Sequence, residues 1–288
     1  MSGGLTLPGD SDRTLTGDDL DLAAALTGCR LLLCYGLLGE LMARLRPIGL
    51  DYMGAQQDWL RALGLPVQVV ALPTAAPVAT NAARLAVVLV EDPRPALLVA
   101  HSKGGLEALA ALLSPGAVGH CRGFIAIQSP FFGSPVADAI CAQPALHRAA
   151  HHTLRALGLG SGQGLHDLTT TARIAWMTEH ADAIAALTRR LPMVTVASEL
   201  TAADGLHDQA YLPLCRWMRA RGAGPSDGLV PVASARLPGA RQVLLAGGHR
   251  SLVAEGGGRD PVGVLRDLLW QMLNARCGGG LEACDAPP

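Results

Sequence analysis

The chain has 288 residues, of which half are hydrophobic and 16% are charged, and its formal net charge is -1. This length and composition suffice for one large domain with a substantial buried core. The nearly neutral charge argues against a basic surface for nucleic acid or for an anionic membrane. No apolar run reaches the roughly 18 residues of a transmembrane helix, and the N-terminus lacks the features of a signal peptide. We therefore expect a cytoplasmic protein without a transmembrane segment.

Short apolar runs alternate with helical patterns along most of the chain. The predicted strands are 29–35, 67–72, 97–100, 123–127, 193–197 and 242–246. The predicted helices are 51–63, 79–89, 104–113, 211–221 and 262–273. Because the strands are continuously apolar rather than alternating, they favour a parallel sheet that is covered on both faces. The predicted fold class is α/β, with a mostly parallel, doubly wound sheet.

Three segments do not follow this alternation. Residues 1–28 begin with a stretch rich in Gly, Asp and Thr and predict a flexible or loosely attached leader. Residues from about 136 to 191 lack strand signals and predict a helical cap inserted over the ends of the strands, where such insertions can serve as lids. Residues 278–288 predict a loose tail. The remaining chain, 29–277, is expected to form a single domain that includes the cap.

Ser102 stands between a predicted buried strand and a predicted helix. The segment 100–105 reads Ala-His-Ser-Lys-Gly-Gly, so small residues flank the serine at the positions where a tight strand-to-helix turn needs them. Such a turn raises the hydroxyl above the sheet and directs the N-terminus of the following helix at the group that the hydroxyl attacks. Ser102 is therefore a candidate nucleophile.

A serine hydroxyl needs a base, and the base needs an acid that orients it. In a doubly wound sheet, such partners lie on loops at the carboxyl ends of later strands. Asp227 lies in the turn-rich segment 225–231, and His249 directly follows the strand 242–246. The chain order of serine, aspartate and histidine is the order associated with this kind of fold.

Four segments of the chain carry a further pattern. They are 34–39 (CYGLLG), 100–105 (AHSKGG), 129–138 (SPFFGSPVAD) and 226–231 (SDGLVP). In this order they resemble the V-H-G-L-x-G oxyanion loop, the [GA]-H-S-x-G-G nucleophile turn, the T-P-H-x-G-S-x-x-A-D segment and the N-D-G-L-V-P acid loop of bacterial triacylglycerol lipases and esterases of the α/β-hydrolase family. The resemblance covers the chain from about residue 31 to the last predicted helix.

The resemblance implies a role for each matching residue. Ser102 would attack an acyl carbonyl carbon, His249 would act as general base and then as general acid, and Asp227 would orient the imidazole. The backbone N–H groups of Leu37 and Lys103 would form the oxyanion hole.

The sequence departs from the family pattern at several positions. Tyr35 replaces the usual histidine of the oxyanion loop, and Phe131 and Phe132 replace a more polar pair. We assign these three residues to the substrate pocket, although the two phenylalanines could equally pack beneath the cap. The calcium-binding aspartate that many of these lipases carry after the catalytic histidine is absent, since Arg250 follows His249. We therefore expect no metal and no cofactor.

Other readings of the candidate residues stay open. Asp204 and Asp208 precede Asp227 and are alternative acids. His101 is adjacent to the serine, but neighbours at such a turn point apart, so we expect it to pack or to bond to a loop. The side chain of Lys103 is expected to be solvated.

The sequence favours a serine hydrolase that cleaves carboxylic esters with an apolar acyl chain. Its partner would be a small-molecule or lipid ester substrate rather than nucleic acid, and the sequence does not specify the oligomeric state. A thioesterase or an intracellular polyester depolymerase could use the same three residues. A non-catalytic α/β-hydrolase that only binds a ligand is the alternative outside enzymes.

Overall fold

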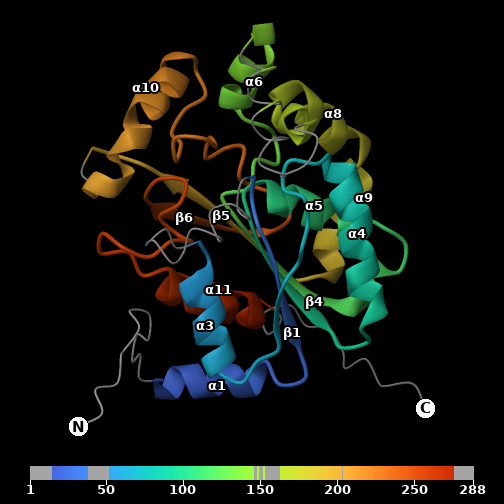
Figure 1. The fold of residues 1–288 in the computed structure, drawn as a ribbon. Helices are drawn as coiled ribbons and strands as arrows, with labels where there is room; N and C mark the ends of the chain where they lie inside the picture. Colours follow the sequence, from blue (N-terminus) through green and yellow to red (C-terminus); the bar gives the residue numbers. More distant parts are fainter. Residues whose placement is uncertain are drawn as a thin grey trace.

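The computed structural model describes residues 15–37, 52–145, 148, 152, 163–202 and 204–275. Within this part of the chain, six strands form one sheet in the order β2-β1-β3-β4-β5-β6 (Figure 1). The strands are β1 (Arg30–Cys34), β2 (Val67–Val69), β3 (Ala96–His101), β4 (Cys121–Ile127), β5 (Met193–Glu199) and β6 (Arg241–Ala246). All neighbouring strands are parallel, so their carboxyl ends meet at one edge. The predicted α/β sheet is confirmed.

Helices cover both faces of the sheet (Figure 1). One face packs against α1 (Gly17–Ala25), α3 (Gly54–Ala62) and α11 (Pro261–Asn274). The other packs against α4 (Val78–Glu91), α5 (Lys103–Leu112) and α9 (Ala181–Arg190). Successive side chains of a strand point to opposite faces, and those of β1 are buried on both. This explains why the strands read as continuous apolar runs.

The prediction of a loosely attached leader over 1–28 is wrong for its second half. Helix α1 begins after Thr16, whose side chain and that of Asp19 form a capping box. Leu22 and Leu26, four residues apart, are buried against the sheet. Burial of this apolar stripe fastens the segment to the domain. Residues 1–14, like the predicted tail 278–288, lie outside the described residues.

The described part of the predicted cap consists of helices between β4 and β5. They are α6 (Pro135–Cys141), η3 (Gln163–Leu168), α8 (Thr170–Glu179) and α9. Ile184 and Leu187 of α9 are buried in the core that α4 and α5 share, so α9 covers the face of the sheet rather than the strand ends. A lid function for the other helices stays a prediction.

The remaining elements connect the strands. A short helix, η2 (Ala117–His120), leads into β4, and η4 (Leu206–Tyr211) with α10 (Leu212–Ala220) follows β5. The loop from α10 to β6 carries Asp227, and the loop from β6 to α11 carries His249. Within the described residues, no helix is long and apolar enough to cross a membrane.

Candidate active site

Ser102 occupies a strained turn between β3 and α5. Its backbone dihedral angles are φ 54° and ψ -126°, a region that residues with a side chain rarely adopt. The Ser102 amide donates to the carbonyl oxygen of Ile127 at the end of β4, over 2.9 Å. The turn is thus anchored to the adjacent strand, and the predicted strand–serine–helix arrangement is confirmed.

Two glycines let other backbone segments approach this turn. A Cβ on Gly104 would lie 2.5 Å from the carbonyl oxygen of Cys34, and one on Gly36 would lie 2.7 Å from the Cβ of Ser102. Any side chain at either position would have to displace the loop that follows β1. This loop therefore passes directly beside Ser102, as the small residues around the serine predict.

The structure brings together the three residues that the sequence singles out. Oγ of Ser102 lies 3.0 Å from Nε2 of His249, and Nδ1 of His249 lies 2.8 Å from Oδ2 of Asp227. Their exposed fractions are 9% for Ser102, 6% for His249 and 1% for Asp227. A carboxylate that accepts from Nδ1 places the imidazole proton there, which leaves Nε2 free to accept the serine proton.

Backbone hydrogen bonds fix the carboxylate of Asp227. Its Oδ1 accepts from the amides of Leu229 and Val230, over 2.8 and 2.7 Å. The amide of His249 in turn donates to the carbonyl oxygen of Asp227, over 2.9 Å. The acid and the histidine are therefore held to each other through backbone as well as side chain.

The two alternative acids have other partners. Oδ1 of Asp208 accepts from Arg259 over 3.1 Å, and Oδ2 of Asp204 accepts from the amide of Thr201 over 2.5 Å. Asp227 is thus the aspartate of these three that bonds to the imidazole.

Leu37 and Lys103 belong to the two backbone segments that meet at Ser102. Lys103 follows Ser102 and opens α5, so its N–H is one of the unpaired donors of a helix N-terminus. Leu37 follows Gly36, at which an added Cβ would lie 2.7 Å from the Cβ of Ser102. Neither amide has a protein acceptor in the part of the chain that the structure describes. Unpaired backbone donors are the groups that hold a developing oxyanion in acyl-transfer enzymes.

The prediction of a solvated Lys103 side chain is wrong. Its ammonium group is fully buried and forms an ion pair with Glu107, one helical turn further along α5. The same carboxylate accepts from Nδ2 of Asn81 in α4, over 2.7 Å. The carboxylate at i+4 supplies the countercharge that allows the lysine to be buried.

The three residues assigned to the substrate pocket lie in different surroundings. Tyr35 is half-buried, and its ring meets that of Tyr52 edge-on with the centroids 5.1 Å apart. Phe131 is fully buried in the core that includes Met177 of α8, and its carbonyl oxygen accepts from Nε of Arg173 in the same helix, over 3.2 Å. Phe132 lines a cavity of about 540 Å³ with Met177 and Ile184. Substrate contact by these residues stays a prediction.

Sequence reasoning missed two residues that contact His101, Tyr52 and Gln128. The hydroxyl of Tyr52 lies 2.6 Å from Nδ1 of His101, whose Nε2 lies 2.9 Å from the carbonyl oxygen of His249. Nε2 of Gln128 donates to the carbonyl oxygen of Gly248, over 2.9 Å. Gln128 is a polar residue directly after an apolar strand, a signal that could have found it. Tyr52 carries no such local signal.

Burial keeps the His101 and Tyr52 side chains neutral. Loss of solvation, reinforced by the neighbouring His249, lowers the pKa of His101 to about 3. Burial likewise raises the pKa of Tyr52 above its usual range. The expectation that His101 bonds to a loop is confirmed by its contact with the His249 carbonyl.

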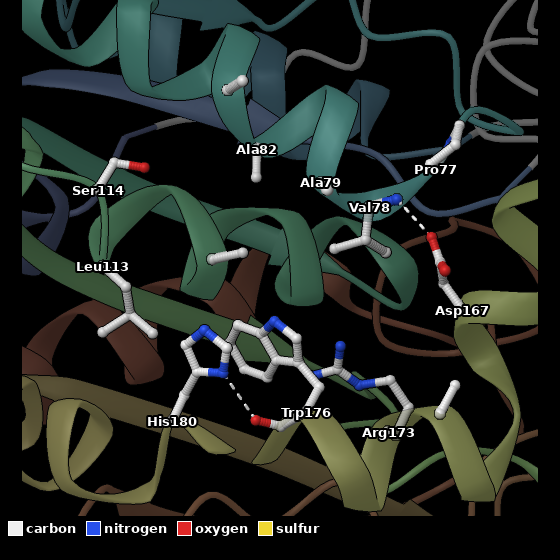
Figure 2. Close-up of a pocket in the computed structure, with 13 residues that line it drawn as sticks. Pro77, Val78, Ala79, Ala82, Leu113, Ser114, Asp167, Arg173, Trp176 and His180 are labelled. Carbon is white, nitrogen blue, oxygen red and sulfur yellow. Dashed lines mark hydrogen bonds between the residues drawn. The ribbon is translucent and has the colours of Figure 1, made fainter. Parts of the chain in front are cut away.

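A separate cavity of about 440 Å³ lies between α4, α5 and α8 (Figure 2). The guanidinium group of Arg173 lies 4.5 Å from the ring centre of Trp176, on which the imidazole of His180 stacks. Burial lowers the pKa of Arg173 to about 10. Because Ser102 and His249 do not line this cavity, it is distinct from the site around the serine.

Among the described residues, no group of three or more His, Cys, Asp or Glu could hold a metal ion.

No protein-family model and no curated protein matches the sequence. Several solved structures resemble the fold. A metagenomic carboxyl esterase, MGS0156, superimposes with a TM-score of 0.67 at 21% identity, over 87% of this chain and 75% of that one. The mature lipase BlEst2 of Bacillus licheniformis gives 0.65 at 22%, over 83% and 91%. The Staphylococcus hyicus lipase gives 0.61 at 13%, over 87% and 97%. The chain has the α/β-hydrolase fold.

Proposed function

We propose that this protein is a serine hydrolase that cleaves carboxylic esters with an apolar acyl chain. The observation that carries the proposal is the hydrogen-bonded series from Ser102 through His249 to Asp227, with distances of 3.0 and 2.8 Å. Its position at the carboxyl ends of parallel strands is where α/β folds bind their ligands. The esterase and lipase names of the structural neighbours support the same class of reaction.

In the first half of the reaction, Oγ of Ser102 attacks the acyl carbonyl carbon while Nε2 of His249 takes the hydroxyl proton. Asp227 stabilises the imidazolium that results. The carbonyl oxygen becomes an oxyanion, which accepts from the amides of Leu37 and Lys103. The bond to the alcohol oxygen then breaks, and His249 gives its proton to that oxygen. The alcohol leaves, and the acyl group stays on Ser102.

In the second half, water takes the place of the alcohol. His249 removes one proton from the water as its oxygen attacks the acyl carbon, and the same two amides hold the second oxyanion. When the bond to Oγ breaks, His249 returns the proton to Ser102 and the carboxylic acid leaves. Loss of one oxyanion donor costs about 10²–10³ in rate in comparable enzymes.

The proposed preference for an apolar acyl chain rests on the residues of the segment inserted between β4 and β5. The inserted segment 136–191 is rich in Ala and Leu, and Phe131 and Phe132 belong to or pack against the same apolar core as its helices α8 and α9. Such surroundings favour a chain without polar groups through burial of apolar surface. A cytoplasmic location is proposed on the sequence alone.

The test is a series of nitrophenyl esters from acetyl to palmitoyl, run beside the corresponding acyl thioesters and a short aliphatic polyester. We expect ester hydrolysis that improves with acyl length, and a loss of at least about 10³ in kcat for Ser102→Ala. Faster turnover of thioesters or of the polyester would move the assignment to that substrate. Unchanged ester hydrolysis by Ser102→Ala would contradict the mechanism.

A further inference from the structure

A continuous series of buried hydrogen bonds runs beside the proposed triad, from the loop after β1 to the loop after β6. The amide of Gly36 lies 2.9 Å from the hydroxyl of Tyr52, and that hydroxyl lies 2.6 Å from Nδ1 of His101. Nε2 of His101 lies 2.9 Å from the carbonyl oxygen of His249. The series therefore joins the residue before Leu37 to the backbone of the proposed general base.

The chemistry of the groups determines which atom donates in each hydrogen bond of this series. The Gly36 amide can only donate, so the Tyr52 oxygen accepts from it and the Tyr52 proton is directed to Nδ1 of His101. The His249 carbonyl can only accept, so Nε2 of His101 carries the proton. A neutral imidazole with one donor and one acceptor satisfies both demands. The series has one arrangement of protons and no mismatch.

The two ends of the series carry different parts of the proposed machinery. The amide of Leu37, next to Gly36, is one proposed oxyanion donor, and the imidazole of His249 is the proposed base. Gln128 adds a second bond to the same loop through the carbonyl oxygen of Gly248. The Tyr52 hydroxyl links the loop after β1 to the histidine loop through the imidazole of His101.

We propose that Tyr52 and His101 are positioning residues that hold the Leu37 amide and the His249 imidazole in fixed register on either side of Ser102. The inference rests on the proposed function and deepens it. Neither side chain touches the reacting atoms. Both act by fixing backbone on which an oxyanion donor and a base are mounted, and small displacements of such groups reduce transition-state stabilisation more than substrate binding.

Tyr52→Phe tests the inference with almost no change of shape. It removes the acceptor of the Gly36 amide and the donor to His101 while keeping the ring against Tyr35. We expect kcat to fall about tenfold with KM changed less than about twofold, because the Leu37 donor loses its support in the transition state. The affinity for an alkyl boronic acid, which forms a tetrahedral adduct with serine, should fall by a similar factor. All rates are referred to sites counted by titration with a fluorophosphonate.

Two variants of His101 provide an independent test if Tyr52→Phe does not fold. A glutamine side chain offers one donor and one acceptor, as the neutral imidazole does, whereas leucine offers neither. We expect His101→Gln to retain more of kcat than His101→Leu. If the two side chains act through the same series of hydrogen bonds, the double variant Tyr52→Phe/His101→Leu should have nearly the same kcat as His101→Leu alone.

Thr16→Ala is the matched control for lost stability. It removes the cap of α1, a helix outside the proposed site, and should leave kcat per titrated site unchanged. If wild-type protein hydrolyses esters but Tyr52→Phe and His101→Leu both keep kcat and boronate affinity within twofold, the positioning inference is wrong and the proposed function stands. If wild-type protein hydrolyses no ester and does not react with the fluorophosphonate, the proposed function itself has failed.

Discussion

Oδ2 of Asp227 lies 2.8 Å from Nδ1 of His249, while its Oδ1 accepts from two backbone amides. In Asp227→Asn, the side-chain oxygen would keep those two bonds and the NH₂ group would face the imidazole. His249 would then carry its proton on Nε2 and could not accept the one from Ser102. We expect kcat to fall by about 10³–10⁴ with the fold intact, as measured by ester hydrolysis and circular dichroism.

Asp204→Asn is the matched control, because Asp204 bonds to the amide of Thr201 and not to the imidazole. It should leave kcat within about twofold of wild type. Equal losses in the two variants would contradict the assignment of Asp227 as the acid.

The close contact between α5 and the loop after β1 gives a second prediction. In Gly104→Ala, the new methyl group would lie 2.5 Å from the carbonyl oxygen of Cys34, a backbone atom that cannot turn aside. We expect the free energy of unfolding to fall by at least about 2 kcal/mol, and kcat to fall as the loop carrying Leu37 shifts. Urea denaturation and ester hydrolysis measure the two effects.

Gly119→Ala is the comparison for this substitution, since nothing lies within 4 Å of a Cβ at that position. It should change the free energy of unfolding by less than about 1 kcal/mol. Similar losses in both variants would mean that the contact with Cys34 does not constrain the turn.

The buried pair of Lys103 and Glu107 gives a third prediction. Glu107→Leu would leave the Lys103 ammonium buried without its countercharge, which typically costs about 3–5 kcal/mol. In the double variant Lys103→Met/Glu107→Leu, no charge is left to bury, so most of this loss should be recovered. Urea denaturation of Lys103→Met, Glu107→Leu and the double variant measures the coupling energy between the two side chains. If Glu107→Leu lowered the free energy of unfolding by less than about 1 kcal/mol, the Lys103 ammonium would be solvated by other groups or by water, and the prediction would be wrong.

The neutral state of His101 gives a fourth prediction, on stability against pH. Its pKa is about 3 in the folded protein and 6.5 in the ordinary case, so between these values only the unfolded chain binds the proton. The free energy of unfolding should therefore fall as the pH is lowered from 6.5 towards 3, by up to about 1.4 kcal/mol per pH unit from this residue. His101→Gln lacks the ionisable group, so urea denaturation should show a shallower acid slope. Identical slopes would indicate that His101 is protonated in the folded protein.

Local patterns were sufficient to predict the fold and the proposed triad. The turns that carry Ser102 and His249 directly follow strands, and Asp227 lies in the longer connection after β5. Parallel strands bring the connections at their carboxyl ends to one edge of the sheet. The same reasoning missed α1, although Thr16 and Asp19 form a capping box that the sequence displays. The error arose because the Gly-, Asp- and Thr-rich composition of the N-terminal segment was interpreted as a sign of flexibility.

Contacts between distant segments could not be predicted in this way. Tyr52 lies in a connection between β1 and α3, and only the folded chain places it against His101, 49 residues further along. The burial of Lys103 depends likewise on Asn81 and Glu107, from two helices that pack together. Only the spacing of Lys103 and Glu107 by four residues was visible in the sequence.

The central claim is that Ser102 is a nucleophile activated by His249. Its most direct test is to incubate wild-type protein, Ser102→Ala and His249→Ala with a fluorophosphonate and to locate the adduct by peptide mass spectrometry. We predict a single adduct on Ser102 in wild-type protein, none in Ser102→Ala, and labelling slowed by at least about 10³ in His249→Ala. Folded wild-type protein that carries no adduct on Ser102, or labelling that is equally fast without His249, would contradict the account.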